Sequence, residues 1–250
     1  MNQRLRAVIP TARLAPYLRE ATVQHADAIE LYRWNSALSL ALFDDVSNVE
    51  VVMRTQMSHH LSGHHGADWF RRADLFDDGA AKAMSAAWDQ GRLQKLVERG
   101  APPDVVHGTF VASLTFGFWV KLLGRGSFAG RQPMRTRRFY DDALWKPTLS
   151  KAFPNVGHLE RSKVERAAED VLKIRNRIAH HEHVIWGIPA YGQRNQDGSP
   201  RRIGVRSAHA TLLDLAGYLN DDLSSWLTAN SGVPALLAGC PLADTSRLLL

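Results

Sequence analysis

The side chains best suited to chemistry in this chain stand together in residues 175–182, which read RNRIAHHE. Within about two turns of a helix, this run places guanidinium, amide, imidazole and carboxylate groups. A guanidinium offers a planar fork of donors that suits phosphate oxygens, and an imidazole exchanges protons near neutral pH. The run therefore predicts a site that grips a phosphate and moves a proton.

The helix that must position these groups is predicted from about residue 159 to the neighbourhood of His181. Its apolar side chains recur at helical spacing on one face: Val164, Ala168, Val171 and Ile178. Arg175 falls within that stripe, where an unpaired guanidinium is costly to bury, so it requires an acidic partner, a phosphate or water. His180 projects with Asn176 on another side, roughly 140° from Arg175. A straight, isolated helix therefore does not aim Arg175 and His180 at one atom.

Two arrangements resolve this divergence. The helix loosens near its end, at residues 179–182, or two copies of the run face each other across a dimer and share a composite site. The alternative is that the run has a structural role and no catalytic one. Arg175 is then one half of a buried ion pair. The histidines of residues 180–183 then stand at a helix terminus, whose dipole favours cationic imidazole. The spacing alone leaves these alternatives open.

A second pair of charges, Glu50 and Arg54, lies four residues apart, a spacing that brings side chains together on a helix. An ion pair within that helix is the default interpretation. A pair between Glu50 and Arg175 is the alternative, because it supplies the acidic partner that Arg175 requires.

A cluster of histidines has spacings that bring two imidazoles together on a helix: His59, His60, His64 and His65. No carboxylate or further imidazole is clearly placed to complete a zinc site. A solvated helix end is therefore favoured, and no metal site is predicted.

Composition is typical of a globular protein, with 250 residues of which 45% are hydrophobic and 22% charged. The single cysteine, Cys240, excludes an internal disulfide. The longest apolar runs fall far short of the ~20 residues needed to cross a bilayer, and the N-terminus lacks the pattern of an export signal. We therefore expect a cytoplasmic protein with no membrane partner.

Helical periodicity dominates the sequence and alternating apolar and polar runs are scarce, so we predict an all-α fold in one domain, residues 1–250. Helices are expected near residues 11–20, 26–43, 47–61, 80–99, 110–123, 140–153, 159–181 and 207–227. Pro147 predicts a kink in the weakest of these helices. Residues 187–205 are expected to form a loop or small hairpin, and residues 228–250 a short tail.

The motif at residues 175–182 resembles that of a known protein family. Residues 175–180 match the pattern of HEPN-domain ribonucleases, which is an arginine, a polar residue, three more residues and a histidine. The longer run to Glu182 resembles the Abi-like, or abortive-infection, branch of that group. Three upstream segments resemble Abi-like segments in the same order: LYRWN at 31–35, NVEVVMR at 48–54 and LTFGFW at 114–119. The resemblance spans about residues 11–225, and it departs at Thr55, where many relatives carry asparagine.

The resemblance implies an HEPN-like helical bundle, here with additional N-terminal helices and irregular loops. It also implies a metal-independent endoribonuclease without a cofactor, usually a homodimer whose two motifs line one cleft. Arg175 would stabilise transition-state charge, His180 would act as general base or acid, and Asn176 would orient the imidazole or the phosphate. Arg177 and His181 would contact RNA or face the second subunit.

The expected reaction uses the nucleophile that RNA itself carries. The 2′-hydroxyl attacks the adjacent phosphate once a base takes its proton, leaving a 2′,3′-cyclic phosphate and a 5′-hydroxyl. Such an enzyme acts in phage defence or as the toxin of a toxin–antitoxin pair, which adds an antitoxin as a partner. The alternative is a catalytically silent RNA-binding or dimerisation module of the same fold.

A basic segment, residues 124–138, is a second candidate for RNA contact. It contains Gly, Pro and much of the positive charge behind the formal net charge of +6. Its arginines are Arg125, Arg131, Arg135, Arg137 and Arg138. A loop of this composition reaches solvent and suits phosphate, although a solvated loop without a ligand fits equally well. The aromatic residues of 116–119 could stack bases, but their apolar surroundings favour a place in the core.

Overall fold

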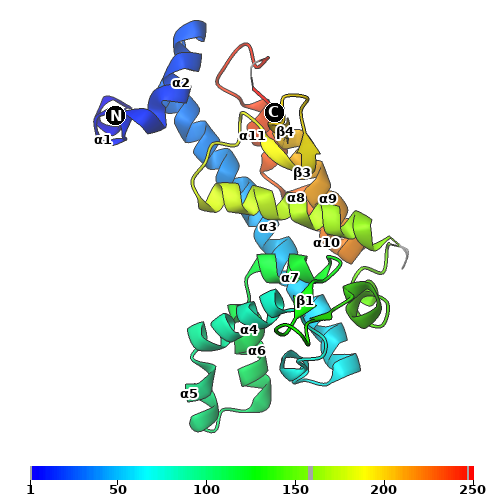
Figure 1. Ribbon diagram of the computed structural model, residues 1–250. Helices are drawn as coiled ribbons and strands as arrows, with labels where there is room; N and C mark the ends of the chain where they lie inside the picture. Colours follow the sequence, from blue (N-terminus) through cyan, green and yellow to red (C-terminus); the bar gives the residue numbers. More distant parts are fainter. Residues whose placement is uncertain (1, 157–159, 247) are drawn as a thin grey trace. The chain divides into compact units, whose positions relative to one another are not determined.

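The computed structural model describes residues 2–156, 160–246 and 248–250, and within them helices form most of the chain (Figure 1). Strands appear in this described part as two short antiparallel hairpins, so the all-α prediction is confirmed. The chain forms two compact units. The first comprises residues 1–47, 173–213 and 225–250, and the second comprises residues 48–172 and 214–224. Several helices contribute residues to both units, and the prediction of one domain stays a prediction.

The first unit contains the N-terminal helices, the end of the motif helix and the C-terminal elements. Its elements, whole or in part, are α1 (Asn2–Val8), α2 (Thr11–Gln24), α3 (Ala28–His65), α8 (Arg161–Ala179), β3 (Ile188–Arg194), β4 (Pro200–Ile203), α9 (Val205–Leu219), α10 (Asp221–Asn230) and α11 (Val233–Ala238). One face of α3 is buried at helical spacing through Leu31, Leu38 and Leu42. The Trp34 indole Nε1 donates to the carbonyl of Leu236 at 2.8 Å, which ties α11 to α3.

Helix α3 corrects the prediction of separate helices at residues 26–43 and 47–61, because it runs without a break from Ala28 to His65. No glycine or proline lies between the two predicted helices. Asp45, in the expected gap, is buried and accepts a hydrogen bond from the Ser231 hydroxyl at 2.6 Å, with His209 Nε2 at 3.2 Å. Partners distant in sequence thus stabilise an acidic side chain inside the helix.

The second unit has an aromatic core. Its elements beyond the shared helices are η1 (Trp69–Arg71), α4 (Asp78–Gln90), α5 (Leu93–Glu98), α6 (Pro103–Ser113), α7 (Phe116–Leu122), β1 (Phe128–Ala129), β2 (Thr136–Arg137), η2 (Asp141–Trp145) and η3 (Leu149–Ala152). The Trp69 ring lies 6.0 Å from that of Phe110 and 5.9 Å from that of Trp119. Phe116, Phe118 and Trp119 are at most 3% exposed, so their assignment to the core is confirmed.

Two further predicted helices are each divided in the structure. The helix expected at 80–99 breaks where Arg92 adopts a φ of 50°, and the one expected at 110–123 bends by 90° between α6 and α7. Thr115 causes this second break, because its hydroxyl accepts from the amide of Phe118 at 3.3 Å and starts a new helix. No single helix in the described residues is long and apolar enough to cross a membrane.

The remaining elements agree in part with the predicted helix and loop boundaries. The helix expected at 140–153 is replaced by the short turns η2 and η3, with Pro147 between them. The hairpin expected at 187–205 forms as β3 and β4, and the helix expected at 207–227 is divided into α9 and α10. The predicted start of the motif helix, residue 159, lies outside the described residues. In the tail, the Leu249 amide donates to the carbonyl of Ile185 at 2.8 Å, so this end of the chain is docked.

The basic segment 124–138 is largely a loop, as predicted, in which two residues at each side pair as the hairpin β1–β2. Gly126 lies just before β1. Gly126 has a φ of +75°, and a Cβ there would overlap the carbonyl oxygen of Arg138. We expect Gly126→Ala to lower the free energy of unfolding by more than about 2 kcal/mol, from left-handed strain plus this clash.

Gly198→Ala is the matched control, because Gly198 has a φ of +82° but nothing within 4 Å of the Cβ position. Strain alone should cost about 1 kcal/mol there. Urea denaturation followed by circular dichroism measures both losses, and equal losses would contradict the role assigned to Gly126.

Candidate functional site

Helix α8 ends inside the motif, and it ends through a left-handed residue. The amide of His180 makes the last regular helical bond, to the carbonyl of Asn176 at 3.0 Å. His181 then adopts a φ of 55°. Its amide donates to the carbonyl of Ile178 at 2.8 Å, and the amide of Glu182 donates to that of Arg177 at 2.9 Å. This pattern satisfies the last carbonyls of a helix and usually employs glycine at the left-handed position. The helix therefore ends only after His180, whose amide still makes a regular helical bond, so this turn does not by itself bring His180 toward Arg175.

The side chain of Arg177 stabilises this turn. Its side chain is 9% exposed, and its guanidinium contacts Glu182 Oε2 at 2.6 Å and donates to the carbonyl of His183 at 2.6 Å. Burial lowers the pKa of Arg177, and the positive charge of Arg202 acts in the same direction while Glu182 opposes it. The RNA or subunit contact expected of Arg177 stays a prediction, since the structure shows its donors engaged in holding residues 182 and 183.

His183 and Trp186 connect the turn to the N-terminal helices. The His183 ring meets that of Trp186 edge-on at 4.6 Å, and the Trp186 ring meets that of Tyr17 at 5.2 Å. Tyr17 also packs against Tyr32 of α3 at 5.4 Å. These rings fix α2 beside the end of α8. They thereby bring Arg13, one turn before Tyr17 on α2, to the motif.

The three predicted catalytic residues lie at this helix end with different exposures. Asn176 and His180 are exposed one turn apart, and Arg175 is half-buried. A guanidinium nitrogen of Arg175, Nη1, lies 3.5 Å from Asn176 Oδ1, at the outer limit of a hydrogen bond. Its Nε is buried without an acceptor among the described residues. Arg175 and Asn176 are thus brought together, with His180 one turn further along the same exposed side as Asn176.

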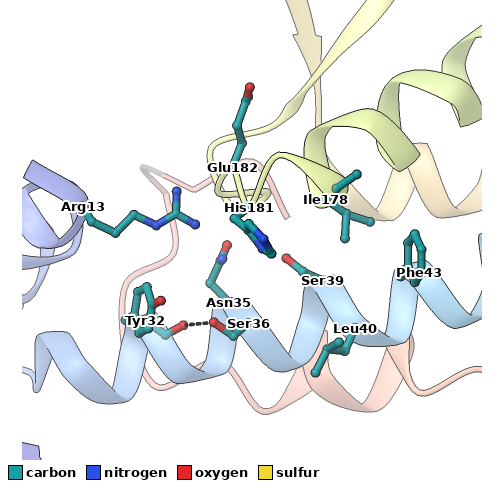
Figure 2. Close-up of a pocket in the computed structure, with 11 residues that line it drawn as sticks. Arg13, Tyr32, Asn35, Ser36, Ser39, Leu40, Phe43, Ile178, His181 and Glu182 are labelled. Carbon is teal, nitrogen blue, oxygen red and sulfur yellow. Dashed lines mark hydrogen bonds between the residues drawn. The ribbon is translucent and has the colours of Figure 1, made fainter. Parts of the chain in front are cut away.

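A cavity of about 460 Å³ opens between the end of α8, α2 and α3 (Figure 2). Its lining includes Arg13, Tyr32, Asn35, Ser36, Ser39, Leu40, Phe43, Ile178, Ala179, His181 and Glu182. The imidazole of His181 projects toward Ser39 of α3, Arg13 points its guanidinium into the same space, and Glu182 points away (Figure 2). His181 rather than His180 therefore faces the cavity.

The cavity has a polar end and an apolar end. Asn35 is 3% exposed and its Oδ1 accepts from the amide of Val184 at 3.0 Å, which anchors the segment after the motif to α3. The hydroxyl of Ser39 is buried and has no hydrogen-bond partner in the described residues. At the other end, Leu40 is 69% exposed and Phe43 is 38% exposed. Sequence reasoning missed Arg13 and Ser39, because nothing in their local pattern distinguishes them.

The other predicted residues lie in the second unit. Glu50 and Arg54 are half-buried in α3, and a pair of Glu50 with Arg175 stays a prediction because the two residues belong to different units. Arg135 and Arg137 are exposed on the β1–β2 hairpin, whereas Arg138 is half-buried and donates to the carbonyl of Ala73 at 3.4 Å.

The histidine cluster forms two adjacent pairs instead of one site. The rings of His59 and His60 lie 5.1 Å apart, and those of His64 and His65 lie 4.6 Å apart. Burial lowers the pKa of His60, and the neighbouring His59 and Lys151 act in the same direction. No group of three histidine, cysteine or acidic side chains in the described residues is placed to hold a metal ion.

Comparison with known families matches residues 12–186 to the Abi-like protein family. The chain belongs to the Abi-like protein family. The match begins in α2 and ends at Trp186, so the residues that line the cavity, from Arg13 to Glu182, lie within it. Membership supports, at a general level, a role in abortive infection, which is a form of phage defence. Comparison with curated proteins gives no match, and comparison with solved structures gives none either.

The left-handed backbone of this Abi-like motif yields a stability prediction. Glycine adopts a positive φ without the cost that a Cβ imposes, whereas alanine keeps that cost. We therefore expect His181→Gly to exceed His181→Ala in free energy of unfolding by about 1 kcal/mol. Urea denaturation of the two variants measures the difference. A more stable alanine variant would show that the turn is not left-handed in solution.

His183 yields a prediction of pH dependence. Burial lowers the pKa of His183, and the positive charges of Arg177 and Arg202 lower it further. The unfolded chain then binds this proton more readily than the folded chain, so stability is complete above about pH 6.5 and declines as pH falls below it. Arg177 Nη2 lies 3.2 Å from His183 Nδ1, and in His183→Asn the amide oxygen takes the place of Nδ1 as acceptor but does not titrate. We expect a shallower decline of unfolding free energy, measured by urea denaturation between about pH 7 and 5. An unchanged decline would show that protonation of His183 does not cause the loss of stability at low pH.

Proposed function

We propose that this Abi-like chain is a metal-independent endoribonuclease whose reaction is centred on Arg175, Asn176 and His180. The observation that carries the proposal is the end of α8. An exposed imidazole and amide stand there on the same helix end as the half-buried guanidinium of Arg175, whose Nη1 reaches only the outer limit of a hydrogen bond to Asn176. A phosphate oxygen is the ligand that such a guanidinium suits best.

The proposed reaction needs only groups that the chain and the RNA supply. His180 takes the proton of the 2′-hydroxyl or delivers one to the leaving 5′-oxygen, because imidazole does both near neutral pH. Arg175 stabilises the charge that develops on the phosphate in the transition state. Asn176, which lies 3.5 Å from Arg175 Nη1, orients the guanidinium, and its exposed amide also reaches the phosphate.

The cavity beside the motif is lined by His181 but by none of the three residues assigned to the reaction, so in this proposal it holds a neighbouring nucleotide. Its volume of about 460 Å³ suits a single nucleotide. Arg13 at the polar end pairs with a phosphate, and Leu40 and Phe43 at the apolar end contact a base. His181 projects between these two ends (Figure 2). In this proposal His181 positions the nucleotide that adjoins the scissile phosphate.

A homodimer is part of the same proposal. His180 does not line the cavity, and the helical wheel separates it from Arg175, so a second copy of the motif would complete the set of groups around one phosphate. The second copy would lie beside the motif and leave Leu40 and Phe43, which are exposed on α3, open to the base. An antitoxin that occupied this face would block the cavity.

The proposal predicts that His180→Ala loses RNA cleavage by at least about a hundredfold while remaining folded, because general acid–base catalysis contributes that much or more. Purified protein is incubated with single-stranded RNA and EDTA, and products are analysed for 2′,3′-cyclic phosphate ends. His59→Ala is the matched control, since His59 is also exposed on a helix but lies in the second unit.

Full activity in His180→Ala would contradict the assignment of the catalytic histidine. RNA binding by the wild-type protein without any cutting would instead establish the catalytically silent module.

A further inference from the structure

The β1–β2 hairpin belongs to the second unit, and β1 is labelled in Figure 1. Exposed arginines and exposed aromatic rings lie together along it. Residues 124–140 contain five arginines and no acidic residue. All of these arginines except Arg138 are exposed. Phe128 is 38% exposed and Phe139 is 57% exposed, although phenylalanine rings of the second unit's core are almost completely buried. The surface therefore combines positive charge with aromatic rings that are partly exposed.

Guanidinium groups and rings alternate across this surface. The Arg135 guanidinium carbon lies 4.5 Å from the centre of the Phe128 ring. The Arg137 guanidinium carbon lies 5.6 Å from Phe128 and 5.3 Å from Phe139. Stacking of this kind holds flexible arginine side chains in place while their donors stay available to an anion.

The hairpin is anchored, so the surface is held in a defined shape. The amide of Gly130 donates to Asp78 Oδ1 of α4 at 3.0 Å, and the amide of Arg138 donates to the carbonyl of Ser127 at 2.7 Å. The amide of Tyr140 reaches the carbonyl of Arg125 at 3.3 Å, and the Tyr140 ring itself is buried. The exposed rings thus project from a rigid base, and rigid aromatic groups bind a flexible ligand at a lower entropic cost.

We propose that this hairpin binds single-stranded RNA, with bases stacked on Phe128 and Phe139 and phosphates paired with Arg131, Arg135 and Arg137. The choice of RNA rests on the proposed function, and the inference adds a strand-holding surface distinct from the residues that cut. A single strand presents unpaired base faces and phosphates in alternation, which matches the alternation of rings and guanidiniums. An acidic protein would pair with the arginines but would leave the rings without a planar partner.

The test measures RNA binding in the His180→Ala background, so that the strand stays intact whether or not the wild type cuts. The probe is a fluorescent oligouridylate of about twelve nucleotides, read by fluorescence anisotropy. We expect Phe128→Ala with Phe139→Ala to weaken binding at least about tenfold, because stacking supplies a salt-independent part of the affinity. Circular dichroism confirms folding, and Phe128→Leu with Phe139→Leu, which keeps apolar bulk without a ring, should behave like the alanine pair.

The arginines are tested by salt dependence. Arg135→Ala with Arg137→Ala should reduce the slope of log K against log salt by about 1.4, since each phosphate contact with a single strand contributes about 0.7. Arg201→Ala is the matched control, because Arg201 is an exposed arginine of the other hairpin whose guanidinium bonds Gln193 Oε1 at 3.1 Å. It should leave both the affinity and the slope nearly unchanged.

The inference is overturned if the phenylalanine pair binds oligouridylate as tightly as the His180→Ala parent. It is also overturned if an RNA duplex, or a polyglutamate competitor, binds the hairpin as well as the single strand does. These outcomes are separate from failure of the proposed function. If the wild-type protein does not cut RNA but its RNA binding depends on Phe128 and Phe139, the proposed ribonuclease activity is rejected and the hairpin binding site is retained. If the protein cuts RNA normally but binding does not depend on the two phenylalanine rings, the hairpin site is rejected and the ribonuclease activity is retained.

Discussion

The candidate site depends on one backbone constraint, the left-handed residue that ends α8. With a φ of 55°, His181 turns the chain so that the last carbonyls of the helix find donors, and the guanidinium of Arg177 locks the residues that follow. The same turn sends the His181 imidazole into the cavity and leaves His180 in solvent. Glycine would adopt this conformation at a lower cost, so the histidine side chain is present at the expense of backbone strain.

Two neighbouring arginines differ in how far their positive charge is compensated by the protein. Arg177 lies close to Glu182 and donates to the carbonyl of His183, so its charge is compensated within the turn. Arg175, half-buried on the same helix, reaches only the limit of a hydrogen bond with Asn176 and keeps a buried Nε without an acceptor in the described residues. In the proposed function Arg175, whose charge is less fully compensated than that of Arg177, is the arginine that meets the phosphate.

The sequence predicted what depends on local pattern. Helical periodicity indicated the all-α fold, and the composition of residues 187–205 indicated a loop or a small hairpin, where β3 and β4 form. The wheel left open whether α8 loosens near its end or two copies of the motif face each other. What the sequence missed depends on distant contacts: Asp45 sits inside an unbroken α3 because Ser231 and His209 partner it. Arg13 enters the cavity because aromatic rings hold α2 in place. Exposed Phe128 and Phe139 could not be told from core residues by composition, since only the hairpin decides which rings face solvent.

The most direct measurement follows histidine side-chain resonances by NMR, in protein labelled with ¹⁵N at histidine, as a 2′-O-methyl oligoribonucleotide is added. This analogue binds but lacks the nucleophile, so the strand remains intact. If the turn at His181 builds a phosphate and nucleotide site, the imidazole signals of His180 and His181 will shift with the binding curve, while that of His59 will not. If the analogue binds and the signals of His180 and His181 do not move, the end of α8 is not the site at which RNA is handled.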